Sequence, residues 1–199
     1  MVEHLDINRF FESLITNRSD ESLSVHNHPI LFKQYGIYPS DYYQVIICAI
    51  DPTDNLENSQ YVEERYQFVY AWLQHKLTDL DTRISVYSLP SNRRFAILLQ
   101  SQHEYYLNYL KHIQKEYHEF FDSSISFGIG NKVTEFTQLS TSFMEANEAY
   151  EGGLDKMRKE FMNFYQSKSM KELLQLIPPS KLKPFTQHTF CLLYTSDAA

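Results

Sequence analysis

The chain has 199 residues, of which 43% are hydrophobic and 15% aromatic, which is enough apolar material for one well-buried domain with flanking helices. It carries 18 Lys and Arg against 25 Asp and Glu, a formal net charge of -7, without a Lys/Arg-rich run, so this stretch by itself is not expected to bind nucleic acid. Its two cysteines, Cys48 and Cys191, share no metal-ligand spacing, and its longest apolar run, 45–50, is too short to cross a membrane, so we expect a cytoplasmic protein without disulfides.

The N-terminal segment, 1–40, is predicted to be helical and to lead into the main domain. Apolar residues at three- and four-residue steps from Leu5 to Ile15 predict an amphipathic helix that ends before Asn17. A second helix is expected over 30–35, and the following Gly36 is expected to end it.

The main domain is expected over 41–166 and begins with a buried strand, YYQVIICAID, at 42–51. A long helix follows over 62–80, and the strands RISVYSL and RFAILLQ then form a hairpin around a polar turn. After a helix over 107–120 come the strand SISFGIG, a helix from Phe136 that Gly152 and Gly153 end, and a short strand, FMNFY. Gly128 and Gly130 are expected to let a helix pack closely against their strand. This order predicts an α+β fold of the ferredoxin-like, split βαβ kind, with helices covering one or both faces of a mixed sheet.

The C-terminal part is expected to fall into two pieces. Residues 167–190 are predicted to begin a helical connection, with a short helix, MKELLQLI, before a break at Pro178 and Pro179. Residues 191–199, CLLYTSDAA, do not continue that pattern, and their codons would resemble a transposase adapter used in preparing sequencing libraries. We expect the native sequence to stop near Phe190; a natural tail is the alternative.

Several stretches, in this order, resemble the GGDEF-like fold: YSLPSNRRFAILLQ at 87–100, SISFGIGNK at 124–132 and SFMEANEAY at 142–150. More narrowly, the strand ending at Gly130 and the helix 142–149 resemble the degenerate form of that domain in the PucR and CdaR families of purine-catabolism and sugar-diacid regulators. Phe143 stands where that form has Tyr. The segment 161–185 resembles the one that follows in those regulators, so the resemblance covers 42–190.

This resemblance implies the regulatory, signal-receiving domain of a cytoplasmic bacterial transcription regulator, and not an enzyme. DNA would be bound only through a C-terminal helix-turn-helix domain, which this chain stops before reaching. A small-molecule metabolite is the expected effector. A homodimer is also expected, since aromatic pairs such as Tyr105-Tyr106 and Phe120-Phe121 suit an interface. The alternative regulator is an AraC-type two-component response regulator, in which a similar domain links receiver and DNA-binding ends.

The hairpin turn carries the candidate site residues: Ser91, Asn92, Arg93 and Arg94. In active GGDEF enzymes, glycines at this turn let a nucleotide approach and acidic residues handle the metal and the attacking hydroxyl. Neither glycine nor carboxylate stands at the turn here, so the resemblance implies no cofactor, no metal and no catalytic residue. A nucleotide cyclase with an aberrant hairpin is the remaining enzymatic alternative.

Two interpretations of the arginines remain open. Guanidinium groups pair with carboxylates and phosphates, so Arg93 and Arg94 are candidates for contact with an anionic effector. A solvated hairpin tip is the other interpretation. Asp51, at the end of the first strand, matches one metal-binding aspartate of the active enzymes, but the sequence Asp-Pro-Thr-Asp also predicts a turn.

Overall fold

The computed structural model describes residues 7–16, 29–51, 59–81, 83–100, 105–155 and 160–167. The chain divides into two compact units, Met1–Tyr165 and Gln166–Ala199, and the fold described below is that of the first. Beyond Ser167, the predicted helical connection and the predicted tail at 191–199 lie outside the described residues. The domain boundaries therefore stay predictions.

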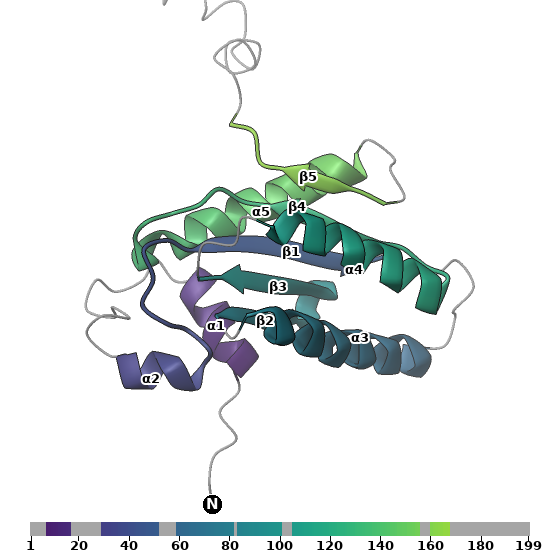
Figure 1. Ribbon diagram of the computed structural model, residues 1–199, viewed down its shortest axis with the longest axis horizontal. Coiled ribbons are helices and arrows are strands. Elements are labelled where there is room, and N and C mark those ends of the chain that lie inside the picture. The colour runs from purple at the N-terminus through teal and green to yellow at the C-terminus, as the bar shows by residue number, and fades with distance from the viewer. Residues whose placement is uncertain are drawn as a thin grey trace, which may run out of the picture. The chain divides into compact units, whose positions relative to one another are not determined.

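The predicted order of helices and strands is confirmed (Figure 1). The elements are α1 (Ile7–Thr16), α2 (Pro29–Gln34), β1 (Gln44–Ile50), α3 (Ser59–Leu80), β2 (Ile84–Leu89), β3 (Arg94–Leu99), α4 (Tyr106–Phe121), β4 (Ile125–Ile129), α5 (Leu139–Leu154) and β5 (Met162–Phe164). Short 3-10 turns at Pro90–Asn92 and Phe136–Gln138 precede β3 and α5. Among the helices described, none combines the length and the apolar character that a membrane span requires.

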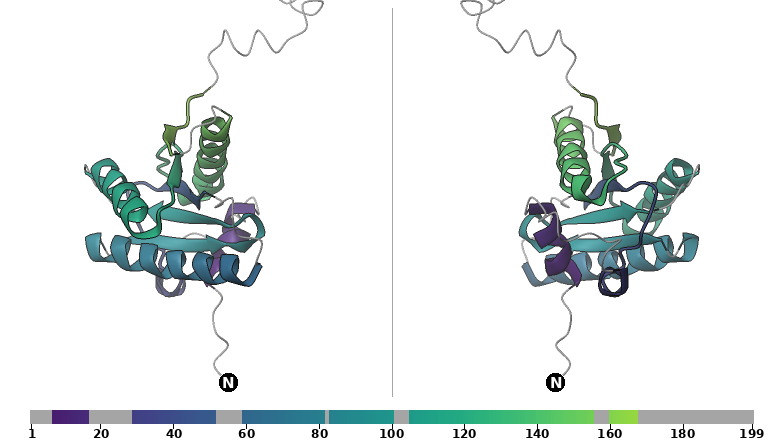
Figure 2. Two further views of the ribbon diagram at one scale, coloured as in Figure 1. Left: turned by 90° about the vertical axis from the view of Figure 1, so that its right-hand side faces the viewer. Right: turned by 90° about the vertical axis from the view of Figure 1, so that its left-hand side faces the viewer.

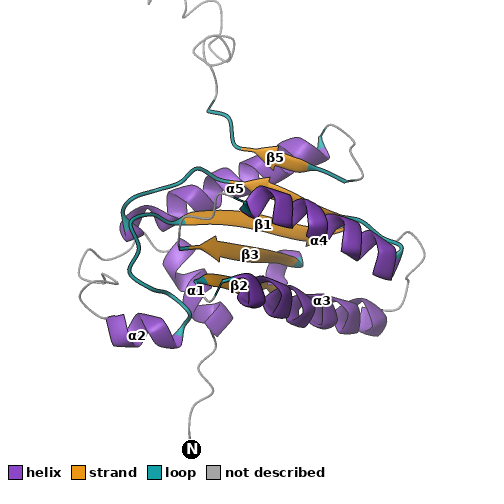
Figure 3. Ribbon diagram, in the orientation of Figure 1, coloured by secondary structure: helices purple, strands orange, loops and turns teal. Residues whose placement is uncertain are grey.

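The strands form one sheet in the order β2-β3-β1-β4-β5 (Figure 3). β1 lies at its centre, antiparallel to both β3 and β4, and β2 pairs with β3 as the predicted hairpin. β5 adds to the edge at β4 in the parallel direction, which makes the sheet mixed. The predicted α+β, ferredoxin-like arrangement is confirmed, and β5 extends it by one strand.

Helices cover both faces of the sheet, with α3 and α4 on one face and α1 and α5 on the other (Figure 2). Alternate residues of β1 serve the two cores: Ile46 and Cys48 pack with α3 and α4, whereas Val45 and Ile47 pack with α1 and α5. Because both faces are buried, the central strand is a continuous apolar run without alternation. Phe32 of α2 joins the core that contains α1.

On β4, small residues face α5 and let it approach closely, which confirms the expectation for Gly128 and Gly130. A Cβ atom on Gly128 would collide with backbone atoms of Ala146 and Tyr150, and one on Gly130 with the backbone of Ser142. The helix therefore lies almost directly on the strand backbone. This contact fixes α5 against the sheet.

The predicted end of the third long helix is wrong. α5 continues through Gly152 and Gly153 to Leu154. A Cβ atom at Gly153 would overlap the ring of Phe161, which is buried and immediately precedes β5. Glycine serves here to let the ring pack on the helix, whereas the sequence alone suggested a helix stop.

Candidate functional site

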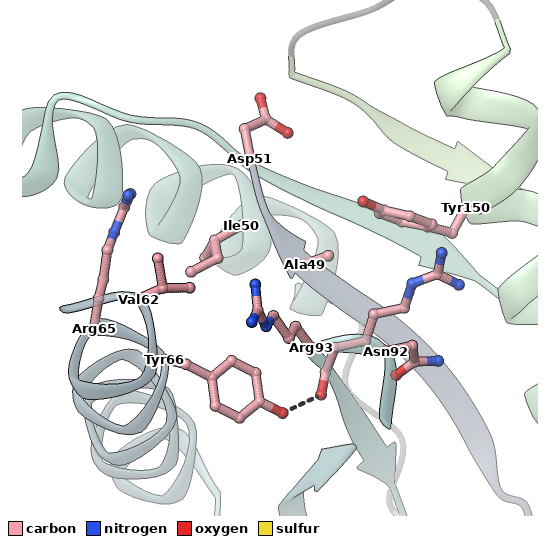
Figure 4. A pocket seen from close by; sticks show the side chains of 10 residues that line it. Ala49, Ile50, Asp51, Val62, Arg65, Tyr66, Asn92, Arg93 and Tyr150 are labelled. Carbon is pink, nitrogen blue, oxygen red and sulfur yellow. Dashed lines mark hydrogen bonds between the residues drawn. The ribbon is translucent and has the colours of Figure 1, made fainter. Parts of the chain in front are cut away.

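A pocket of about 340 Å³ lies where the β2–β3 hairpin meets the end of β1, the first half of α3 and the last turns of α5 (Figure 4). Its lining consists of Ala49, Ile50 and Asp51 at the end of β1, Val62, Arg65 and Tyr66 of α3, Asn92, Arg93 and Arg94 of the hairpin, and Tyr150 of α5. The pocket thus gathers guanidinium groups beside apolar and aromatic side chains. Such a mixture of an apolar wall and a few polar groups is typical of small-molecule sites.

Tyr66 holds both ends of the hairpin turn. Its hydroxyl donates a hydrogen bond to the backbone oxygen of Arg94 at 2.7 Å and accepts one from the backbone N–H of Leu89 at 3.1 Å. The hydroxyl oxygen of Ser88 lies 2.9 Å from the hydroxyl oxygen of Tyr66. The Tyr66 ring stacks on the ring of Phe95, with the centroids 4.5 Å apart. Burial raises the pKa of Tyr66, although its hydrogen bonds to Ser88 and Leu89 oppose the rise, so the hydroxyl remains a neutral donor at physiological pH.

Arg94 connects the hairpin to α5. Its Nη1 donates a hydrogen bond to Oδ1 of Asn147 at 3.2 Å, and its Nη2 forms an ion pair with Glu151. The guanidinium carbon lies 4.5 Å from the centre of the Tyr150 ring, a cation–π contact. Burial raises the pKa of Tyr150 to about 12, with Arg94 opposing the rise and Asp51 adding to it. Arg94 is therefore held by three side chains of one helix.

Arg93 is arranged differently from its neighbour. Its backbone is left-handed, with a φ of 53°, and its N–H donates to the oxygen of Pro90 at 3.3 Å, closing the 3-10 turn. The side chain points into the pocket, on the side of Val62 and Tyr66 (Figure 4). Among the residues that the structure describes, no side chain pairs with its guanidinium group. Arg93 thus contributes a positive charge that the described part of the protein does not neutralise.

The two remaining charged side chains of the lining come from α3 and from the end of β1. Arg65 donates a hydrogen bond from Nη2 to the hydroxyl of Tyr117 at 2.9 Å. Asp51 is fixed through its backbone N–H, which donates to the oxygen of Ser124 at 2.9 Å. Among the described residues, the lining therefore carries one carboxylate and three guanidinium groups, a balance of charge that favours anions.

The structure brings together most of the predicted site residues. Asn92, Arg93 and Arg94 line the pocket, whereas Ser91 is exposed in the 3-10 turn and is not part of the lining. Asp51 also lines the pocket. Residues 52–58, on which the predicted Asp-Pro-Thr-Asp turn falls, lie outside the described residues.

Sequence reasoning missed the residues that α3 and α5 contribute. Tyr66 falls within the helix predicted over 62–80, and Tyr150 ends the motif at 142–150, but neither was predicted to line a site. Nothing local marks Arg65 as a site residue, because it lies in a helix beside other charged residues. Their meeting depends on the sheet order, which places the hairpin strand β3 beside β1.

The sheet order β2-β3-β1-β4-β5, with helices on both faces, defines an α+β domain of the ferredoxin-like class. Within that class, the sequence model of the GGDEF-like domain matches residues 31–151, which is more than half of the chain, so the chain belongs to the GGDEF-like domain family. The match includes every lining residue of the pocket.

One characterised protein is similar over part of the chain. The purine catabolism regulatory protein of Bacillus subtilis (strain 168) is 30% identical over 87 residues. The aligned segment covers 44% of this chain and 16% of that protein. The alignment therefore spans about a sixth of the relative's length.

The lining does not fit the metal that active members of such a fold would hold. A divalent cation prefers several oxygen ligands, mostly carboxylates, and nearby guanidinium groups repel it. Asp51 is the one carboxylate among the lining residues that the structure describes. Across the described parts of the chain, no three His, Cys, Asp or Glu side chains come together in a way that could hold a metal ion.

Proposed function

We propose that this chain is the non-catalytic, signal-receiving domain of a cytoplasmic bacterial transcription regulator of the PucR type. The observation that carries the proposal is the chemistry of the hairpin turn at the pocket, where Ser91, Asn92, Arg93 and Arg94 stand in place of the glycines and carboxylates that nucleotide cyclisation needs. The 87-residue similarity to a purine catabolism regulatory protein supports the regulatory role.

In this proposal, a metabolite or an upstream domain changes the packing of the GGDEF-like domain. That change repositions a DNA-binding helix-turn-helix domain that follows this chain in the full-length regulator. Energetically, an effector achieves this only if it binds one arrangement more tightly than the other. The chain's own acidic balance is consistent with DNA contacts being made by another domain.

A second copy of the chain is the proposed partner for the α3–α4 surface. Phe68 of α3 is 58% exposed and Phe120 of α4 is 71% exposed. Phe68 also contacts Phe121, with ring centroids 5.7 Å apart, so the exposed aromatics continue into a packed cluster with Trp72. Aromatic side chains are enriched at protein interfaces, and regulators of palindromic DNA are commonly dimers.

Sequencing the source locus across both ends of this segment tests the regulatory assignment. A downstream helix-turn-helix in the PucR arrangement would support it. An AraC-type DNA-binding end behind a receiver domain would instead make the chain a linker domain of a two-component response regulator. An open reading frame that ends at Ala199 would refute the transcription-regulator assignment.

The absence of catalysis is tested directly by incubating the purified chain with GTP and Mg²⁺ and separating the nucleotides by chromatography. We expect GTP to be recovered unchanged. Any cyclic dinucleotide product would contradict the proposal. A product that disappears in the Asp51→Asn variant would assign the reaction to this pocket.

A further inference from the structure

We propose that the hairpin pocket binds a small organic anion without a metal ion, with Arg93 pairing with its carboxylate or phosphate group. This inference rests on the proposed function, because it identifies the chemical class of the signal that the domain receives. It differs from nucleotide and metal binding by active GGDEF enzymes, since the binding group is a guanidinium of this chain.

The backbone at Arg93 is the first observation. Only Arg93 and Asp122 have a positive φ among the described residues other than glycine. Asp122 terminates α4, where a short polar residue tolerates the left-handed conformation. A long side chain such as Arg gains nothing locally from this conformation, which glycine or asparagine adopts more easily. Such a backbone conformation at a pocket is a reason to infer a function for the side chain that it carries.

The second observation is the contrast between the two adjacent arginines. Arg94 is engaged by Asn147, Glu151 and Tyr150, and the Glu151 carboxylate offsets its charge. Arg93 has no such side-chain partner in the described part of the chain, yet the rigid turn beside it fixes where its side chain starts. A placed but uncompensated guanidinium presents two parallel N–H donors to an oxyanion.

Pocket size and walls limit the ligand. A volume of about 340 Å³ is near the lower end of small-molecule sites, so the ligand is a compact metabolite and not a polymer. Ala49, Ile50 and Val62 give the pocket an apolar side that suits a carbon skeleton. The chemistry is therefore that of a small carboxylic acid or a phosphate monoester.

Thermal unfolding of the whole chain in EDTA tests this inference. The probes are inorganic phosphate, succinate and adenosine monophosphate at tens of millimolar, with sodium chloride at matched ionic strength as the reference. At about a hundred times its Kd, a bound probe is expected to raise Tm by roughly 5–10 °C above the chloride reference. The difference between phosphate and succinate identifies the preferred oxyanion.

Three variants separate binding from folding. Arg93→Gly is expected to abolish the probe-dependent shift without lowering Tm in the absence of probe, because glycine accepts the left-handed backbone. Arg83→Gln is the matched control: it removes an exposed arginine at the opposite end of β2 and should retain the full shift. Arg93→Lys, which keeps the charge but loses the paired donors, is expected to show a smaller shift.

The inference is overturned if no probe raises Tm beyond chloride, or if the shift persists in Arg93→Gly. Neither result bears on the GTP assay or on the gene that surrounds the segment. Failure of anion binding and failure of the regulatory assignment are therefore distinguishable.

Discussion

Substitution by alanine is predicted to change the stability of the fold in opposite directions at the adjacent glycines Gly152 and Gly153, near the end of α5. In a helix, alanine is favoured over glycine by about 0.8–1.0 kcal/mol. Helix propensity alone would therefore make both substitutions stabilising by a similar amount. A Cβ atom at Gly152 would meet only Nδ2 of Asn163, at 3.6 Å, which is an ordinary contact. A Cβ atom at Gly153 would overlap the ring of Phe161, which is 4% exposed and packs on Tyr150 with the centroids 5.3 Å apart.

The expected magnitudes follow from these contacts. Overpacking a buried site costs about 1–3 kcal/mol, because neighbouring side chains must leave their preferred rotamers. Gly153→Ala should therefore lower the free energy of unfolding by about 0–2 kcal/mol after the helix gain is subtracted. Gly152→Ala should raise it by up to about 1 kcal/mol. The two variants should differ by about 1–3 kcal/mol.

Urea unfolding of the whole chain, followed by circular dichroism, measures this difference. With a slope of about 2 kcal/mol/M, the midpoints of the two variants should lie about 0.5–1.5 M apart, with Gly153→Ala unfolding first. Similar slopes in both variants are the control that the unfolded states remain comparable. Equal midpoints would refute the reasoning, because they would mean that Phe161 does not pack against α5 at this position.

Three further predictions concern buried and paired groups. Ser142→Ala should lower the free energy of unfolding by about 1–3 kcal/mol in urea, because the buried hydroxyl accepts the backbone N–H of Val45 at 2.9 Å; unchanged stability would contradict that bond. Lys76 lowers the pKa of Glu116 through a hydrogen bond, so the pair stabilises the fold above about pH 4.3 and loses its effect as the pH falls through the lower folded-state pKa. Lys76→Met should accordingly flatten the acid side of a plot of Tm against pH. Burial raises the pKa of Cys48, so mass spectrometry should find its peptide alkylated by iodoacetamide in urea and unmodified in the native chain.

The fold was largely predictable from hydrophobic periodicity. The apolar stripe from Val62 to Leu80 and the continuous run of β1 specify their element types, because a helix buries one face and a central strand buries both. The helix end predicted at Gly152 was wrong, because Gly153 makes room for the ring of Phe161, which comes from a residue beyond the helix. Local sequence records the glycine but not the contact that requires it.

The candidate site was predictable only where it is continuous in sequence. The hairpin residues Asn92 to Arg94 are neighbours, so their shared position followed from the turn itself. Arg65 and Tyr150 are separated from them by whole elements and reach the pocket through the sheet order. The different roles of Arg93 and Arg94 could not be predicted from the sequence either, because only the fold shows that the side chain of Arg94 contacts α5 and that of Arg93 does not.

The backbone of the hairpin is held in place by contacts that do not involve the side chains at the turn. Tyr66 holds the hairpin through the backbone oxygen of Arg94 and the backbone N–H of Leu89, and neither bond depends on the side chains at the turn. The close approach of α5 to Gly128 fixes another wall without involving the turn. Pocket shape and pocket chemistry are therefore determined by different residues. On the proposed function, arginines in place of carboxylates at the turn would leave these backbone contacts unchanged and would reverse the charge that the pocket favours, from cations to anions.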